Sequence, residues 1–375
     1  MGRTLEQHAH GVALADGKSI KAKRTPHDNS AGCCRQMQEH VLPLVDISKL
    51  ESDTFEDRLG VARDLDRACV EAGFLYIKGS QFDSELFRRL VKRAKLYFAL
   101  DEETKMKSYI GLSENHSGYV PIGEEQFGVG TYDLKEAYDV NYDYPLAEGR
   151  RPLVGPNIWP AMPGFREDVL AYYQHIKAIG HQLFRAFALA LGLEETYFDA
   201  HLRHPPSQLR LIHYPFDATA ADRPGIGAHT DYECFTLLYV TAPGLQVVNK
   251  EGEWVDVPLI DGTLIMNISD MMEILSNGRY VATKHRVKRV AEERYSFPLF
   301  FSCDYDHVIA PVIPDEAPRY QPLKSGEHLY NQTAQTFAYL KQRVARGDLV
   351  LDNAVPLDSF GLQQAGGLQE AGVRA

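Results

Sequence analysis

The sequence predicts an α+β protein with a mainly β core, because two different patterns divide the chain. The first half carries helical spacing, most clearly at residues 165–193, where Val169, Tyr173 and Ile176 are four and three positions apart. From residue 207 the sequence consists of short apolar stretches separated by turn residues, mainly proline and glycine. Such stretches at close spacing are typical of a β-sandwich or a β-barrel.

Each element of the first half follows from a local signal. Residues 1–40 are rich in Gly, Ala, Lys, His and Asp without periodicity, which predicts a poorly ordered extension. Glycines in residues 108–145 predict loops, a natural place for the rim of a substrate site. In chain order, the expected elements are a strand at 41–47, a helix at 54–72, a strand at 73–79, helices at 84–100 and from about 101, a strand at 135–144 and a long helix at 165–193.

The second half predicts a run of strands followed by one helix at 327–346. The expected strands are 207–214, 226–231, 234–241, 244–249, 253–257, 262–267, 281–288 and 294–303. Four segments follow from these patterns: the extension at 1–40, a helical and strand region at 41–205 that packs on the core, a β core with its closing helix at 206–346, and a tail at 347–375.

Composition excludes several classes of function. The formal charge of −11 argues against a nucleic-acid binder, because no basic surplus is present to displace counterions from phosphates. No apolar stretch reaches the ~20 residues of a membrane span, and the start has no apolar signal region. Five cysteines without CxxC spacing, including Cys33 and Cys34, predict a reducing, cytoplasmic location.

A His-x-Asp triplet, His229 and Asp231, is the first sign of a metal site. Side chains alternate along an extended segment, so these two point to the same side. The triplet alone also occurs by chance. Downstream, alternation places His285 on the inward face of a strand whose other face is basic; a lone histidine there would more often be a core residue. Together, two imidazoles and one carboxylate are the ligand set of non-haem Fe(II) oxygenases.

Arg294 and Ser296 share a face of the next expected strand. A guanidinium beside a hydroxyl suits a carboxylate that is held end-on. The alternative is an ordinary arginine at the start of a strand. The metal triad just upstream favours the carboxylate site.

Between residue 41 and about residue 346, the chain resembles the 2-oxoglutarate/Fe(II)-dependent dioxygenases of the isopenicillin N synthase-like family. The matching stretches, in matching order and spacing, are GFLYIKG, LRLIHYP, GAHTDYECFTLLY, PGLQV, DGTLIMNISDMMEILSNGRYVATKHRV and RYSFPLFF. The resemblance implies a double-stranded β-helix (jelly-roll) core flanked by helices. It also implies an enzyme that uses Fe(II), 2-oxoglutarate and O2.

The resemblance assigns roles to individual residues. It makes His229, Asp231 and His285 the iron ligands, and Arg294 and Ser296 the binders of the C5 carboxylate of 2-oxoglutarate. Tyr214 in LRLIHYP matches a tyrosine that contacts the other end of the co-substrate. Ile212 stands where many plant members carry Asn, so the group that supports the C1 carboxylate stays open. The matches at Asn267, Asn277 and Gly278 imply turn and strand geometry.

The implied reaction couples decarboxylation of 2-oxoglutarate, to succinate and CO2, with C–H oxidation of a small molecule. Hydroxylation is the leading outcome, with desaturation and cyclisation as alternatives. The expected partner is a small molecule such as a secondary metabolite or a modified amino acid, with no nucleic acid and no membrane. The residues expected to contact it are Tyr119, Glu125, Phe127, Lys135, Tyr138, Phe300 and Phe301.

Two other functions stay open on the sequence. The first is an oxidase of the same fold that acts without 2-oxoglutarate and uses Arg294 and Ser296 for a substrate carboxylate. The second is a non-catalytic jelly-roll binding protein, for which an Asp231→Ala variant would bind its partner unchanged.

Overall fold

The computed structural model describes residues 42–79, 82–126, 133–144, 151–216, 225–288 and 292–351. These residues all belong to one compact unit, His40–Ala375. The expected extension at 1–40, which contains Cys33 and Cys34, most of the expected tail, and Phe127 lie outside the described residues. None of the described helices is both long and apolar enough to cross a membrane.

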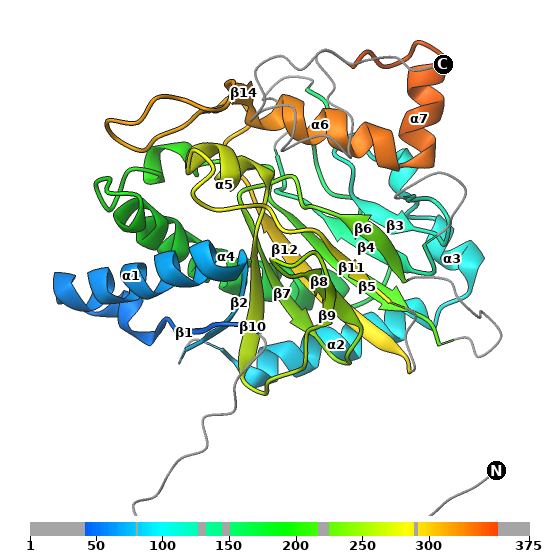
Figure 1. Cartoon of the computed structure of the whole chain (residues 1–375). Helices are drawn as coiled ribbons and strands as arrows, with labels where there is room; N and C mark the ends of the chain where they lie inside the picture. Colours follow the sequence, from blue (N-terminus) through cyan, green and yellow to red (C-terminus); the bar gives the residue numbers. More distant parts are fainter. Residues whose placement is uncertain are drawn as a thin grey trace, which may run out of the picture. The chain divides into compact units, whose positions relative to one another are not determined.

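An eight-stranded sheet forms the larger layer of the β core (Figure 1). From one edge to the other, its strands are β1 (Leu44–Asp46), β2 (Phe74–Lys78), β10 (Thr263–Ile268), β7 (Phe235–Val240), β12 (Arg294–Phe301), β5 (Gln208–Tyr214), β4 (Glu136–Val140) and β3 (Gly118–Val120). Only the β1–β2 pair is parallel. Four of these strands precede residue 205, so the region expected to pack on the core is also built into its sheet.

A smaller antiparallel sheet packs against the larger one. Its strands, in order, are β6 (Ile226–His229), β11 (His285–Val287), β8 (Leu245–Val248) and β9 (Trp254–Asp256). Apolar side chains join the sheets in one buried cluster that includes Phe74 and Ile265 from the large sheet and Leu245 and Val247 from the small one. This is the β-sandwich architecture that the spacing of short strands predicts.

Three helices pack with the large sheet around the main hydrophobic core: α1 (Phe55–Ala72), α2 (Ser84–Phe98) and α4 (Phe165–Ala190). The Asp83 carboxylate starts α2 by accepting bonds from the amides of Glu85 and Leu86. Helix α4 approaches β12 closely at Gly180, where a Cβ atom would lie 1.9 Å from the Phe301 ring. Only glycine fits there without movement of the ring.

The end of the chain departs from the expected single helix at 327–346. It forms two helices, α6 (Ser325–Thr336) and α7 (Ala338–Ala345), because Phe337 takes an extended conformation with ψ of 131°. The expected strand at 281–288 is shorter, and only its second half is β11. The remaining elements are the helices α3 (Glu102–Met106) and α5 (Asp270–Leu275), the strands β13 (Val308–Ile309) and β14 (Leu323–Lys324), and 3-10 turns at Ser48–Glu51, Ile110–Leu112 and Asp199–His201.

Candidate metal and co-substrate site

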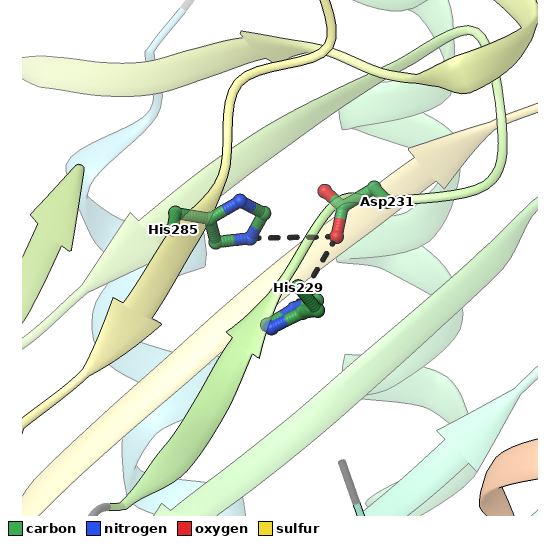
Figure 2. Close-up of side chains that lie close together, drawn as sticks. All are labelled: His229, Asp231 and His285. Carbon is green, nitrogen blue, oxygen red and sulfur yellow. Dashed lines mark ion pairs between the residues drawn. The ribbon is translucent and has the colours of Figure 1, made fainter. Parts of the chain in front are cut away.

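The small sheet brings the two histidines of the predicted triad together. His229 is the last residue of β6 and His285 the first of β11, and the two are paired across these antiparallel strands. Their ring centroids are 4.3 Å apart, and Asp231 turns toward both rings (Figure 2). Strand β6 ends at His229, so Asp231 lies on the following loop. The expected strand to residue 231 is therefore too long, and alternation along it does not orient the carboxylate.

The three side chains present their ligand atoms to one point. The Asp231 Oδ1 atom lies 3.6 Å from His229 Nε2 and 3.4 Å from His285 Nε2. The Nδ1 atoms face backbone carbonyl oxygens, of Gly227 at 2.8 Å and of Thr283 at 3.2 Å. Because a carbonyl oxygen only accepts, each Nδ1 carries a proton, and each Nε2 is the nitrogen directed to the metal position. The three ligand atoms lie within 4.8 Å of one another.

Two side chains of the large sheet hold the Asp231 carboxylate. The Thr236 hydroxyl donates to Oδ2 at 2.5 Å, and the Asn267 amide donates to the same oxygen at 2.8 Å. Thr236 on β7 and Asn267 on β10 are directly paired in the sheet. With Oδ2 occupied in this way, Oδ1 is directed to the histidines. The role of Asn267 is therefore more than the strand geometry that the sequence suggests, and Thr236 was not predicted.

Burial and charge set the protonation of the triad. Burial, followed by the nearby His285, lowers the pKa of His229 to about 4. Burial would raise the pKa of Asp231, but the two histidines and the Thr236 bond bring it well below its ordinary value. Burial would lower the pKa of His285, and Asp231 raises it on balance. The site therefore holds an anionic carboxylate against imidazole nitrogens, which suits a divalent cation.

The donor set fits Fe(II). Two imidazole nitrogens and one carboxylate oxygen, each oriented by a second bond, are the ligands of non-haem Fe(II) oxygenases, and they leave coordination positions open. Metal binding would displace any proton from the His285 Nε2 atom. When bound, Fe(II) supplies the redox chemistry, and the protein supplies binding and orientation.

The three predicted co-substrate residues lie together in the same cavity as the triad. Arg294 is fully buried, donates from Nε to the carbonyl oxygen of Ala242 at 3.0 Å, and donates from Nη1 to the Ser296 hydroxyl. Its guanidinium lies over the Tyr214 ring, 4.8 Å from the centroid, and the two residues are paired between β12 and β5. Tyr214 therefore lies beside the group that binds the C5 carboxylate, and not at the other end of the co-substrate, where the resemblance places it. A buried guanidinium beside a hydroxyl forms a receptor for one carboxylate.

The cavity around these groups has about 840 Å³ of empty space, its mouth included. Its apolar lining includes Ile226, Leu245 and Val287, which come from the small sheet and join the triad to Arg294. The polar groups that line it away from Arg294 include Arg210, Glu125 and Tyr232.

Two of the predicted substrate residues, Glu125 and Phe300, line this cavity. Lys135 lies behind Glu125 and forms a buried ion pair with it. Phe127 is outside the described residues. Sequence reasoning missed Arg210 as a lining residue, although alternation along β5 places it on the same face as Tyr214.

Tyr119, Tyr138 and Phe301 do not line the cavity and belong to the main hydrophobic core. The Tyr119 hydroxyl donates to the Glu136 carboxylate, and Phe301 stacks on Phe235. These three expectations are therefore dropped. Aromatic residues near a predicted loop or strand cannot be divided between core and cavity without knowing which side of the sheet they face.

Fold and site together define a non-haem iron oxygenase, and comparisons with known proteins agree. Residues 42–162 match the N-terminal region of the non-haem dioxygenases in morphine synthesis, and residues 205–302 match the 2OG-Fe(II) oxygenase superfamily. The 2-oxoglutarate-Fe(II) type oxidoreductase hxnY of Emericella nidulans is 33% identical over 301 residues, which are 75% of this chain and 86% of the relative. A homoarginine-6-hydroxylase of Oryza sativa is 32% identical, over 79% of this chain and 97% of the relative.

A similar solved structure is that of a full-length Neurospora crassa protein in complex with alpha-KG (2-oxoglutarate) and thymine. It has a TM-score of 0.70 and 25% identity, and covers 80% of this chain and 98% of its own. The chain belongs to the 2OG-Fe(II) oxygenase superfamily. It is an Fe(II)- and 2-oxoglutarate-dependent oxidoreductase with the jelly-roll fold, as the resemblance implies, and it acts on a small molecule.

Proposed function

We propose that His229, Asp231 and His285 bind the Fe(II) of this enzyme, and that Arg294, Ser296 and Tyr214 bind its 2-oxoglutarate. One observation carries the proposal: the two sets of side chains line the same cavity, and the ligand atoms of the first set converge on one point. The metal and a co-substrate held by its far carboxylate can therefore meet in one site.

Each co-substrate residue has a specific task in this proposal. The Arg294 guanidinium and the Ser296 hydroxyl bind the C5 carboxylate of 2-oxoglutarate, and the face of Tyr214 fixes the plane of that guanidinium. The apolar side chains of Leu245 and Val287 exclude water from the same part of the cavity. In this dry environment the charge-assisted bonds to the carboxylate are stronger than they would be in water.

The substrate that we propose is a small molecule such as a secondary metabolite or a modified amino acid, oxidised at a C–H bond, with hydroxylation as the leading outcome. Support comes from the relatives, since one is a hydroxylase of homoarginine and another was solved with thymine. The expected cytoplasmic location stays a prediction.

The test measures succinate formed and 2-oxoglutarate consumed by the purified chain with Fe(II), O2 and a panel of small molecules, together with the product mass. Succinate formation that rises with one compound, and a mass gain of one oxygen in that compound, would support the proposal. A compound that is oxidised without succinate would overturn it in favour of the oxidase in which Arg294 binds a substrate carboxylate.

A second test addresses the metal ligands. We expect His285→Ala to lose Fe(II) binding, measured as iron per chain after dialysis, while the matched variant of the exposed His204 keeps it. Stoichiometric iron in His285→Ala would contradict the ligand assignment.

A further inference from the structure

We propose that Arg210 orients the substrate by donating a hydrogen bond to an uncharged carbonyl oxygen, and that the enzyme therefore acts on neutral carbonyl compounds rather than on acids or cations. The inference rests on the proposed function and narrows its substrate to neutral compounds, which leaves out amino acids with a free carboxylate and ammonium group; it also adds a positioning residue.

Arg210 lies at the part of the cavity that the co-substrate residues leave open. On β5 it precedes Tyr214 by four residues on the same face, which corresponds to about 13 Å along a strand. The pairing of β5 with β12 places Arg210 in the same way. Arg294 and Ser296 are opposite Tyr214 and Ile212, whereas Leu209, next to Arg210, is opposite Leu299. Arg210 therefore lies along the sheet beyond the groups that hold 2-oxoglutarate.

The Arg210 guanidinium is fixed and has one nitrogen to offer. Its Nε atom donates to Asp139 Oδ1 at 2.9 Å, and Nη1 donates to Glu125 Oε1 at 3.0 Å. The residue is only 6% exposed, and within the described part of the chain the buried Nη2 atom has no hydrogen-bond partner. A buried donor without an acceptor costs about 1–3 kcal/mol, so an acceptor on a bound molecule would be stabilised there.

The charges behind Arg210 argue against a carboxylate as that acceptor. Arg210 shares Glu125 with Lys135, and it also pairs with Asp139. Asp133, whose carboxylate accepts a bond from the Gly227 amide, adds a further acid to this cluster. Its cations are thus already matched by acids, and a second carboxylate would bury surplus negative charge. A cation is disfavoured as well, because the positively charged Arg210 lines this part of the cavity.

The other walls near Arg210 suit a flat molecule. The Phe337 ring lies 5.6 Å from the guanidinium carbon, and the His116 ring meets the same phenylalanine edge-on at 4.3 Å. Burial lowers the pKa of His116 to about 3, so its ring is neutral. Phe300 completes an aromatic lining, and the Tyr232 hydroxyl, another buried group without a partner among the described residues, gives a second polar contact.

The experiment compares three probes of one shape and different charge: benzamide, benzoate and benzamidine. Binding is measured by ligand-observed NMR to the full chain loaded with Mn(II) and 2-oxoglutarate, in which no turnover occurs. We expect benzamide to bind at least about tenfold more tightly than either charged probe. We expect Arg210→Met to weaken the binding of benzamide about 10- to 100-fold, because one hydrogen bond to a charged group is lost. The control Arg93→Met should bind as wild type does, since Arg93 pairs with Asp168 outside the cavity.

Because Arg210→Met leaves the buried Asp139 without its ion-pair partner, whereas Glu125 keeps Lys135, the double variant Arg210→Met/Asp139→Asn provides a second measurement with a balanced charge. In every variant, 2-oxoglutarate binding is recorded first. If the wild type does not bind 2-oxoglutarate, the proposed function is refuted. If 2-oxoglutarate binds normally, the benzamide measurement tests the role of Arg210 on its own. Tighter binding of benzoate or benzamidine, undetectable binding of benzamide, or equal benzamide binding by wild type and a folded double variant would overturn the inference.

Discussion

Removal of the Thr236 hydroxyl should weaken Fe(II) binding although Thr236 does not touch the metal. Thr236→Val keeps the shape of the side chain and deletes one of the two bonds that hold Asp231 Oδ2. The other, from Asn267, remains. With one bond left, the carboxylate can rotate and Oδ1 spends less time directed at the two histidines.

The size of the effect follows from the geometry. Thr236 is 2% exposed, so no bulk water replaces its bond to the carboxylate. A hydrogen bond to a charged group contributes about 1.5–3 kcal/mol, and loss of a group that orients a metal ligand reduces affinity about 10- to 100-fold. The two estimates agree, since each factor of ten corresponds to about 1.4 kcal/mol. The double variant Thr236→Val/Asn267→Ala should lose more than either single variant.

The assay is competition for Fe(II) against a chromophoric chelator under anaerobic conditions. Thr263→Val is the matched control, because it deletes a hydroxyl that donates to the Ile260 carbonyl oxygen at the start of β10, away from the triad. Unfolding of the metal-free proteins separates stability from affinity. If the double variant binds Fe(II) within about twofold of the control, the orientation of Asp231 does not depend on these bonds and the reasoning is refuted.

Three further predictions test other parts of the structure. Arg294→Met should raise the KM for 2-oxoglutarate at least about tenfold while Fe(II) affinity is unchanged, and equal KM values would remove Arg294 from the co-substrate site. Gly180→Ala should lower the free energy of unfolding in urea by about 1–3 kcal/mol, because its Cβ would overlap the Phe301 ring, and an unchanged midpoint would contradict this close approach. Burial raises the pKa of Asp66, but its bonds to Arg279 lower it on balance, so this pair stabilises the fold above the ordinary value of 3.8 and the stabilisation is lost as pH falls. Asp66→Asn should cost about 0.5–1 kcal/mol at pH 7 and less below pH 4, and a cost independent of pH would contradict the assignment.

The sequence predicts the metal triad because its signals are local. Alternation around His285, the spacing of His229 and Asp231, and the pair Arg294–Ser296 each lie within one short stretch. The strands that carry these residues were also predicted, since their apolar and polar side chains alternate. The prediction was wrong at the end of the strand that carries His229, because Asp231 lies on the loop after that strand and is not oriented by alternation.

Groups that depend on pairing between distant strands could not be predicted. Thr236 and Asn267 meet at Asp231 only because β7 lies beside β10, and no local sequence pattern predicts that these two strands are neighbours. Arg210 shares a face with Tyr214, which alternation does indicate, but its importance comes from Asp139 on the adjacent strand. The break between α6 and α7 is similar, because the sequence around Phe337 contains neither proline nor glycine to predict it.

That break gives the cavity a wall that is independent of the metal site. The extended Phe337 lets the chain pair with the loop that carries Glu125, through bonds from the Gln126 amide to the Thr336 carbonyl oxygen at 3.0 Å and from the Ala338 amide to the Glu124 carbonyl oxygen at 2.8 Å. This junction contributes Glu125 and Phe337 to the cavity, whereas strands contribute the histidines and Arg294. Since these junction bonds involve neither β6 nor β11, changes in the junction would alter substrate choice while metal binding persists. Substrate specificity is therefore best sought where the two distant segments meet.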